Sequence, residues 1–193
     1  MNQPSLWYTP VSVPTQTQAE RAHPNRFMVH NGEINTIRGN ADKMLAREET
    51  MASDYLKGQL HKVLPVVDTR GSDSAMLDNT LEFLVMNGMD LPLAVMICIP
   101  EPWANNDTIS QAKRDFYQYY ATMMEPWDGP ASILFSDGDV MGAVLDRNGL
   151  RPSRYYITSD GYMILSSEVG VLPIPEREDR IKKSVSIPEK CFL

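Results

Sequence analysis

The sequence predicts an α+β protein in which helices are layered on antiparallel sheet. Three observations favour this class. Apolar residues recur at helical spacing over much of the first part of the chain, whereas short runs with strand character dominate after Pro130. Asp-Gly and Asn-Gly pairs separate the later runs, as they do in β-hairpins. Because helices and strands come in blocks, an alternating βαβ fold is disfavoured.

The first predicted element is a short strand over residues 26–30, which runs into the turn Asn31-Gly32. Both turn residues tolerate positive φ. A helix is expected over residues 35–50, where the apolar residues follow a helical period. The chain is then expected to become extended at residues 63–67.

A second helix is predicted to begin near Ser72 or Asp73, either of which can cap it, and to run to Gly88. A third helix is predicted over residues 110–124, before Pro126. The remaining elements form an antiparallel meander. Its strands are expected at residues 131–136, 140–146, 155–158 and 162–166.

Composition and charge narrow the function classes. The chain has 193 residues, 42% hydrophobic and 22% charged, which suits one globular domain. Its most apolar stretch, residues 91–100, is too short to cross a membrane, and no secretory signal is evident. We therefore expect a cytoplasmic protein with no membrane partner. The formal net charge of −7 argues against a nucleic-acid partner.

The two cysteines, Cys98 and Cys191, form no metal-binding spacing with the three histidines, so no metal site is expected. The first twenty residues are rich in Pro, Gln, Thr and Ser and show no apolar period. We therefore expect residues 1–20 to be a divergent, flexible leader and residues 21–193 to form the domain.

Three short motifs could carry chemistry. In His30-Asn31-Gly32-Glu33, an amide side chain beside a backbone N–H could form an oxyanion hole, or the motif could be a structural turn. In Gly71-Ser72-Asp73-Ser74, a carboxylate could receive a substrate ammonium, or the motif could only cap a helix. The arginines that follow Asp146 could clamp a carboxylate, but we favour a structural pairing with Asp146.

Long strings of the sequence extend this interpretation. RAHPNRFMVHNGEINTIRGNADKMLARE at residues 21–48, RGSDSAMLDNTLEFLVMNG at 70–88 and MEPWDGPASILFSDG at 124–138 closely resemble glutamate synthase. The resemblance is to the C-terminal part of its class II (type 2) glutamine amidotransferase domain. It covers nearly the whole chain, in the order that the family has.

The resemblance implies an Ntn-hydrolase αββα sandwich, here partial and lacking its N-terminal strands. It implies hydrolysis of glutamine to glutamate and ammonia for glutamate biosynthesis. Asn31 and Gly32 match the family's oxyanion pair. Asp73 matches the acid that receives the α-ammonium of glutamine, with Gly71 and Ser72 lining the same pocket.

The sequence also departs from the family. It has no N-terminal cysteine nucleophile, so we expect the chain alone to be inactive. The FMN and iron–sulfur regions of the parent enzyme are not expected in it. Expected partners are glutamine and either the missing N-terminal half or other glutamate synthase subunits. The alternative is a non-catalytic Ntn-fold remnant that binds glutamine or a partner subunit.

Overall fold

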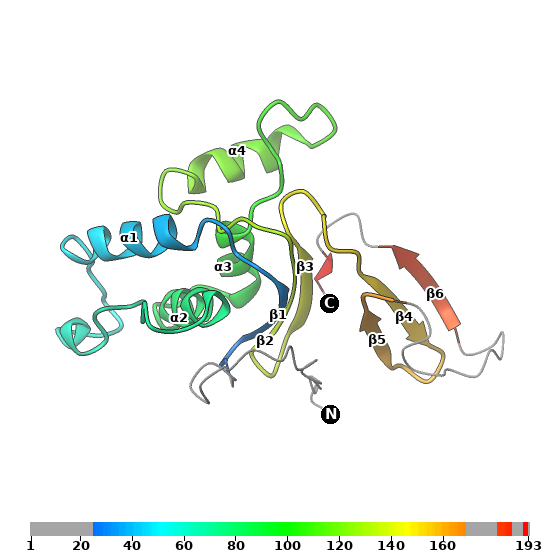
Figure 1. Ribbon diagram of the computed structural model, residues 1–193, viewed down its shortest axis with the longest axis horizontal. Helices are drawn as coiled ribbons and strands as arrows, with labels where there is room; N and C mark the ends of the chain where they lie inside the picture. The colour runs from blue at the N-terminus through cyan, green and yellow to red at the C-terminus, as the bar shows by residue number, and fades with distance from the viewer. Residues whose placement is uncertain (1–24, 169–180, 187–190, 193) are drawn as a thin grey trace.

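The computed structural model describes residues 25–168, 181–186 and 191–192. It contains a group of helices on one side, a sheet in the centre and a second sheet on the far side of the first (Figure 1). The predicted α+β class agrees with this arrangement. The leader predicted at residues 1–20 lies outside the described residues.

The helices are α1 Ile37–Glu48, the 3-10 turn η2 Leu60–Lys62, α2 Asp73–Met86, α3 Leu91–Cys98 and α4 Gln111–Tyr120. The strands are β1 Met28–Gly32, β2 Ala131–Ser136, β3 Met141–Leu145, β4 Arg154–Thr158, β5 Met163–Ser166, β6 Ile181–Ser186 and β7 Cys191–Phe192.

The strands form two sheets, with orders β1-β2-β3-β7 and β5-β4-β6, and every pairing is antiparallel. The predicted strands at 131–136, 140–146, 155–158 and 162–166 are confirmed as β2 to β5. The prediction of a single antiparallel meander is wrong, because β2 and β3 belong to one sheet and β4 and β5 to the other. Leu145 of β3 packs with Tyr155 of β4, so the two sheets meet there.

Two of the predicted helices begin where their capping residues are. The Ser72 side chain accepts the N–H of Ala75 at 3.2 Å and starts α2, and Gly88 follows the end of α2 with φ 86°. Ser110 starts α4 by accepting the N–H of Lys113 at 3.3 Å. The caps therefore fix both helix starts locally.

The extended segment predicted at residues 63–67 is wrong. The structure has the 3-10 turn η2 followed by bends, and none of these residues belongs to a strand. Pro65 has no N–H to give to a sheet. Val66 and Val67 are buried against the helices, so the apolar character of the segment reflects packing and not strand pairing.

The main core lies between the helices and the central sheet. Its fully buried members include Leu77 and Leu81 of α2, Val95 of α3 and Phe135 of β2. A second, smaller cluster joins Leu145 and Tyr155. Within the described residues no helix is long and apolar enough to cross a membrane.

Candidate functional site

The end of β1 carries the predicted Asn-Gly pair as strand residues. Asn31 pairs in register with Ser132 and Gly32 with Ala131 of β2. Gly32 has φ 151°, and a Cβ at this position would lie 1.9 Å from the carbonyl oxygen of Pro130. Only glycine fits here, since any side chain would collide with the neighbouring backbone.

The register of β1 also sets the direction of the Gly32 N–H. The Glu33 N–H donates to the Pro130 carbonyl at 3.1 Å, and the Ser136 N–H donates to Phe27 at 2.8 Å. Hydrogen-bonded and non-hydrogen-bonded pairs alternate along an antiparallel ladder. Gly32 and Ala131 are therefore a non-hydrogen-bonded pair. The Gly32 N–H therefore points away from β2. Among the described residues β1 is the edge strand of its sheet, so this donor faces an open edge.

The two faces of β1 have different surroundings. Met28 is buried in the main core, and the side chain of His30 is 6% exposed and lies beside Asp73 of α2. Side chains alternate along a strand, so Asn31 lies on the face opposite the helices. Asn31 is exposed. Asn31 and Gly32 are therefore consecutive residues at the end of the edge strand, with the Asn31 side chain on the face away from the helices and the Gly32 N–H directed outward in the plane of the sheet.

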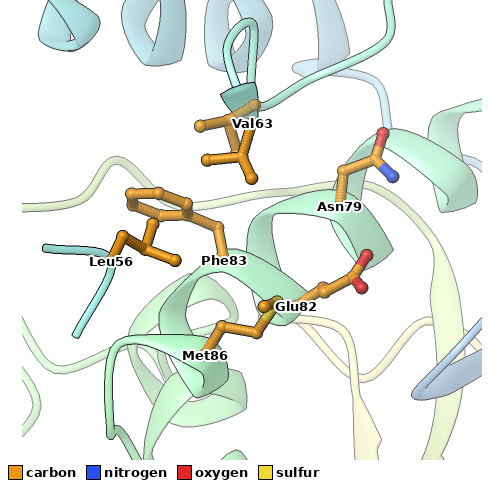
Figure 2. A pocket seen from close by; sticks show the side chains of 7 residues that line it. Leu56, Val63, Asn79, Glu82, Phe83 and Met86 are labelled. Atoms are coloured by element: carbon orange, nitrogen blue, oxygen red, sulfur yellow. The ribbon is translucent and has the colours of Figure 1, made fainter. Parts of the chain in front are cut away.

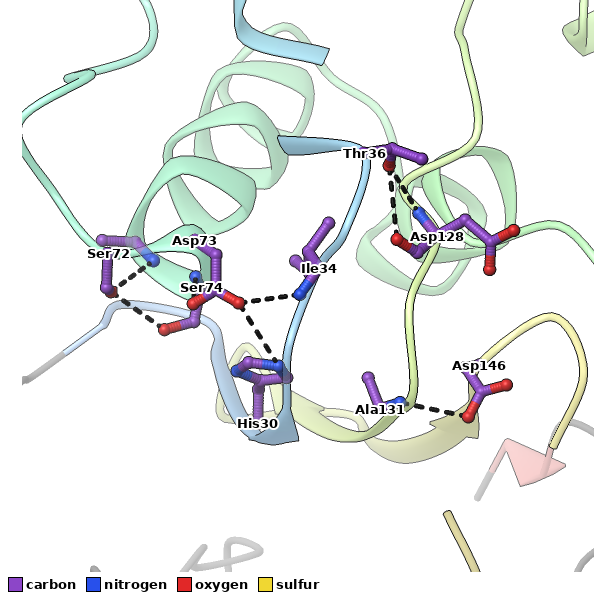
Figure 3. Close-up of polar contacts among 10 residues, drawn as sticks. His30, Ile34, Thr36, Ser72, Asp73, Ser74, Asp128, Ala131 and Asp146 are labelled. Atoms are coloured by element: carbon purple, nitrogen blue, oxygen red, sulfur yellow. Dashed lines mark hydrogen bonds and ion pairs between the residues drawn. The ribbon is translucent and has the colours of Figure 1, made fainter. Parts of the chain in front are cut away.

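Asp73 ties the start of α2 to the segment that follows β1 (Figure 3). Its Oδ2 accepts the N–H of Ile34 at 2.8 Å and lies 3.8 Å from Nε2 of His30. The other oxygen accepts the N–H of Ser74 at 2.7 Å. As the first residue of α2, the carboxylate is also favoured by the helix dipole. The side chain remains 23% exposed, so a ligand can still reach it.

Gly71 and Ser72 support this helix start. The Gly71 N–H donates to the Asp68 carbonyl at 3.0 Å, and a Cβ on Gly71 would lie 3.2 Å from that oxygen. Ser72 caps α2 through Ala75. The hydrogen bond from the Arg70 side chain lowers the pKa of the exposed Asp68 carboxyl. The structure thus places Gly71, Ser72 and Asp73 in one turn, next to the segment that leaves β1.

A second set of contacts, which the sequence did not reveal, holds the segment after β1 from its other side. The hydroxyl of Thr36 accepts the N–H of Asp128 at 2.9 Å (Figure 3). The same hydroxyl donates to Oδ1 of Asn40 at 2.6 Å. Asn40 is buried and donates to the carbonyl of Pro126 at 3.0 Å. These contacts join α1 to the segment that leads into β2.

Two buried carboxylates fix the strands that frame the site. Asp78 of α2 is 3% exposed and accepts the N–H groups of Arg26, Phe27 and Met28 at 2.6–3.1 Å. The sequence contained one indication of this role: residues 74, 77, 78 and 81 have the spacing of the buried face of a helix, and Asp78 is one of them. A charged residue on that face requires partners.

Asp146 is the second buried carboxylate. It accepts backbone N–H groups from Ala131, Asn148, Leu150 and Arg151 at 2.9–3.3 Å. The predicted pairing of the arginine side chains with Asp146 is wrong: in the described residues backbone N–H groups hold this carboxylate, and Arg151 contributes its N–H. Its position two residues before Asn148 is typical of an Asx-turn. The Asp146 carboxylate fixes β2 next to the turn after β3.

The described residues contain no group of three or more His, Cys, Asp or Glu side chains that could hold a metal ion. The chemistry that the described residues can supply at the end of β1 is hydrogen bonding. An outward N–H and an amide can stabilise a developing negative oxygen. The Asp73 carboxylate, which is bonded to Ile34 on the helix side of β1, can bind a cation. The arrangement therefore suits a small substrate with an amide or acyl carbon and an ammonium group.

Comparisons with known proteins agree on one family. The family model for class-II glutamine amidotransferases matches residues 5–193. The chain is 53% identical over 174 residues to a glutamate synthase [NADPH] large chain of Bacillus subtilis, which covers 90% of this chain and 11% of the relative. It is 48% identical over 190 residues to a glutamate synthase [NADH] of Saccharomyces cerevisiae, which covers 98% of this chain and 9% of the relative.

A ferredoxin-dependent glutamate synthase of Oryza sativa is 46% identical over 175 residues, or 89% of this chain and 11% of the relative. The similarity therefore extends to glutamate synthases whose names give different electron donors. This chain spans about a tenth of the length of these curated relatives.

Proposed function

This chain belongs to the class-II glutamine amidotransferases, and we propose that it is part of the glutaminase region of a glutamate synthase. In this role it binds glutamine and supplies the groups that stabilise the transition state of its hydrolysis. The ammonia released would serve glutamate synthesis. Residues 21–193 form the partial amidotransferase domain, and residues 1–20 precede it.

The proposed chemistry assigns one task to each site residue. A cysteine thiolate attacks the side-chain amide carbon of glutamine, a C–S bond forms, and the C–N bond breaks as ammonia leaves. The Asn31 amide and the Gly32 N–H hold the oxygen on which negative charge develops. Asp73 receives the α-ammonium of glutamine, and Gly71 and Ser72 border that position. Water then releases glutamate from the thioester.

The observation that carries this proposal is the geometry at the end of β1. The Gly32 N–H is directed to an open strand edge next to Asn31. The carboxylate of Asp73 is bonded to Ile34, two residues after Gly32, so an anion-stabilising pair and a cation-binding group border one segment. Glutamine carries both matching groups, a side-chain carbonyl and an α-ammonium.

We propose that the nucleophile comes from a polypeptide segment other than these 193 residues. Cys98 is fully buried in the main core, and neither Cys98 nor Cys191 carries a free α-amine that could serve as the base. The absent segment would also complete the αββα sandwich, of which the described residues provide two sheets and one layer of helices. We propose that this segment, from the N-terminal half of an amidotransferase domain or from another glutamate synthase subunit, binds the residues described here.

Ammonia release from glutamine tests the proposal. The purified chain alone should release none. Co-folding it with the cysteine-bearing N-terminal segment of a class-II amidotransferase should produce ammonia release. Asn31→Ala should lower kcat about 10²–10³-fold. Asn35→Ala, a change at an exposed asparagine four residues further on, is the matched control and should have little effect.

Other outcomes would contradict parts of the proposal. Ammonia release by the chain alone, abolished by Asn31→Ala, would place a nucleophile within the 193 residues. Glutamine binding measured by calorimetry, with no turnover after co-folding, would support the alternative of a non-catalytic remnant. If the co-folded protein showed neither glutamine binding nor turnover, glutamine would be excluded as the ligand.

A further inference from the structure

His30 comes directly before the Asn31-Gly32 pair, and its side chain lies on the helix side of β1, beside the start of α2 (Figure 3). The imidazole is buried, and its Nε2 lies 3.8 Å from Oδ2 of Asp73. A polar ring on a buried strand face is costly unless its surroundings are polar. The Asp73 carboxylate supplies such surroundings, and the proposed chemistry gives His30 no task.

One oxygen of Asp73 contacts the chain on both sides of the oxyanion pair. Oδ2 accepts the Ile34 N–H at 2.8 Å and faces the His30 ring at 3.8 Å. Asn31 and Gly32 lie between these two contacts in the sequence. The position of the carboxylate relative to the oxyanion pair therefore depends on Ile34 from one side and on His30 from the other.

The contact between the His30 ring and the carboxylate is electrostatic. At 3.8 Å the nitrogen and oxygen atoms are too far apart for a direct hydrogen bond. A carboxylate only accepts hydrogen bonds, so it favours the imidazole tautomer that carries its proton on Nε2. The positive N–H edge of the ring then faces Oδ2 of Asp73. A ring without an N–H would lose this attraction and keep only its packing.

We propose that His30 is a positioning residue, which keeps the Asp73 carboxylate where it binds the α-ammonium of a glutamine held at the oxyanion pair. This role rests on the proposed function. The α-ammonium keeps its charge throughout hydrolysis and takes no part in the breaking of the amide bond. Asp73 therefore binds it equally well in the ground state and the transition state. Loss of the His30 N–H should raise KM and leave kcat nearly unchanged.

Two substitutions of His30 separate positioning from packing. His30→Gln keeps an N–H donor near the place of Nε2, whereas His30→Phe keeps an aromatic ring and removes the N–H. In the chain co-folded with the cysteine-bearing segment, His30→Phe should raise the KM for glutamine about tenfold and change kcat by less than about threefold. His30→Gln should keep KM within about threefold of that of the unsubstituted protein. If His30 only filled space, Phe would preserve KM better than Gln, which would overturn the proposal.

Two control variants show whether the effect on KM is specific. His61→Phe makes the same change at an exposed histidine of η2 and should leave KM unchanged. Phe83→Leu loosens α2 itself, because Phe83 lines an open cavity of about 130 Å³ beside the C-terminal half of this helix (Figure 2). Phe83 lies about 15 Å along α2 from Asp73. It should lower Tm without raising KM, and a rise equal to that of His30→Phe would assign the effect to packing.

A ligand without the α-ammonium tests whether His30 acts through Asp73. 4-Carbamoylbutanoate is glutamine without this group, and its inhibition constant against glutamine turnover reports its affinity. His30→Phe should leave this constant unchanged while it raises the KM for glutamine. Equal weakening of both ligands would mean that His30 shapes the whole site, and would overturn the proposal.

Imidazole ¹⁵N NMR of the full chain tests the contact without any ligand. The sequence has three histidines, and the His30 signals are those that disappear in His30→Gln. Asp73→Asn removes the charge that faces Nε2, so it should shift the His30 signals and leave the His61 signals in place. Unchanged His30 signals would show that the two side chains do not meet in solution, and would overturn the proposal.

The results distinguish failure of this proposal from failure of the proposed function. If the unsubstituted co-folded protein neither bound nor hydrolysed glutamine, the proposed function would be refuted, and with it the role of His30 in ammonium binding. If that protein turned over glutamine with the same KM as His30→Phe, only the positioning role would be refuted. A rise in KM in His30→Phe that is absent from His61→Phe and Phe83→Leu would support it.

Discussion

At the scale of single residues, two glycines set how closely the end of β1 approaches the segment before β2. A Cβ on Gly32 would lie 1.9 Å from the Pro130 oxygen, and a Cβ on Gly129 would lie 2.0 Å from the Glu33 oxygen. Both contacts are with backbone, which cannot move aside as the end of a flexible side chain can. The candidate oxyanion donor thus depends on two residues without side chains.

Gly32→Ala should therefore lower the free energy of unfolding strongly, by about 3 kcal/mol or more, because the backbone must shift and φ is strained. Gly39→Ala is the matched control. Gly39 lies within α1, and a Cβ there would meet nothing within 4 Å. That substitution should raise stability by about 0.5–1 kcal/mol. Urea denaturation of both variants gives the two values, and equal effects would refute the steric argument.

Asp78 supports a second prediction at this scale. Its buried carboxylate accepts three consecutive backbone N–H groups at the start of β1. Asp78→Asn keeps the shape but turns an NH₂ group towards these donors, so at least one donor loses its partner. We expect a loss of about 3 kcal/mol in urea denaturation. Asp42→Asn, at an exposed position in α1, should change stability by less than about 0.5 kcal/mol.

At the scale of elements, the last turn of α1 is joined to the segment after α4 through Glu125. Arg47 hydrogen-bonds one carboxylate oxygen, and Nζ of Lys43 lies 3.3 Å from the other. Burial raises the pKa of Glu125, but the hydrogen bond from Arg47 and the nearby cations outweigh it. The pKa therefore lies below its ordinary value in the folded protein.

A depressed carboxyl pKa stabilises the protein above the pKa of the unfolded state, about 4.3, and this contribution disappears as pH falls through the lower folded value. Glu125→Gln should therefore cost up to about 1 kcal/mol at pH 7, since the pair is partly exposed. The difference from the unsubstituted chain should shrink as pH falls below about 4.3 and through the lower folded pKa of Glu125. Thermal melts between pH 3 and pH 7 measure the stability difference between the two proteins. A difference that did not change with pH would contradict the proposed dependence on Glu125 ionisation.

Local signals in the sequence predicted some elements well. Ser72 and Ser110 start their helices as expected, and Asp-Gly and Asn-Gly pairs separate the strands. The helix α3 was not predicted, because a segment that is apolar all round shows no helical period. β6 and β7 were also missed. Strands of this kind are defined by distant partners, as when β6 pairs with β4.

In the candidate site, too, the local motifs could be predicted from the sequence, whereas the long-range contacts could not. The Asn31-Gly32 pair and the helix start at Asp73 stand out in the sequence because their local chemistry is distinctive. The contacts that position them are long-range, such as Asp73 with Ile34 and Asp78 with Met28. No spacing rule links residues about 40–50 positions apart. These contacts required the fold.

At the scale of the whole molecule, the two sheets have unequal cores among the side chains whose burial the structure describes. The central sheet shares its core with the helices, and Phe135 of β2 is fully buried there. Among the side chains whose burial the structure describes, the second sheet has a cluster in which Tyr155 is buried against Leu145 of β3, with Ile157, Met163 and Leu165 partly covered. Regions with little buried apolar surface open at a lower free energy than the rest of a protein. The second sheet is therefore expected to open first.

Hydrogen exchange should show this difference directly. Amides in β4 and β5 should exchange about 100-fold faster than those in β2, which corresponds to about 2.8 kcal/mol between the two opening reactions. Tyr155→Ala should accelerate exchange in β4 and β5 only, because its contacts lie in the smaller cluster. Phe135→Ala should accelerate exchange in both sheets, since it weakens the core on which the whole fold depends. Equal exchange in the two sheets would instead mean that the molecule opens as one cooperative unit, and that Leu145 and Tyr155 couple the sheets more tightly than their buried area suggests.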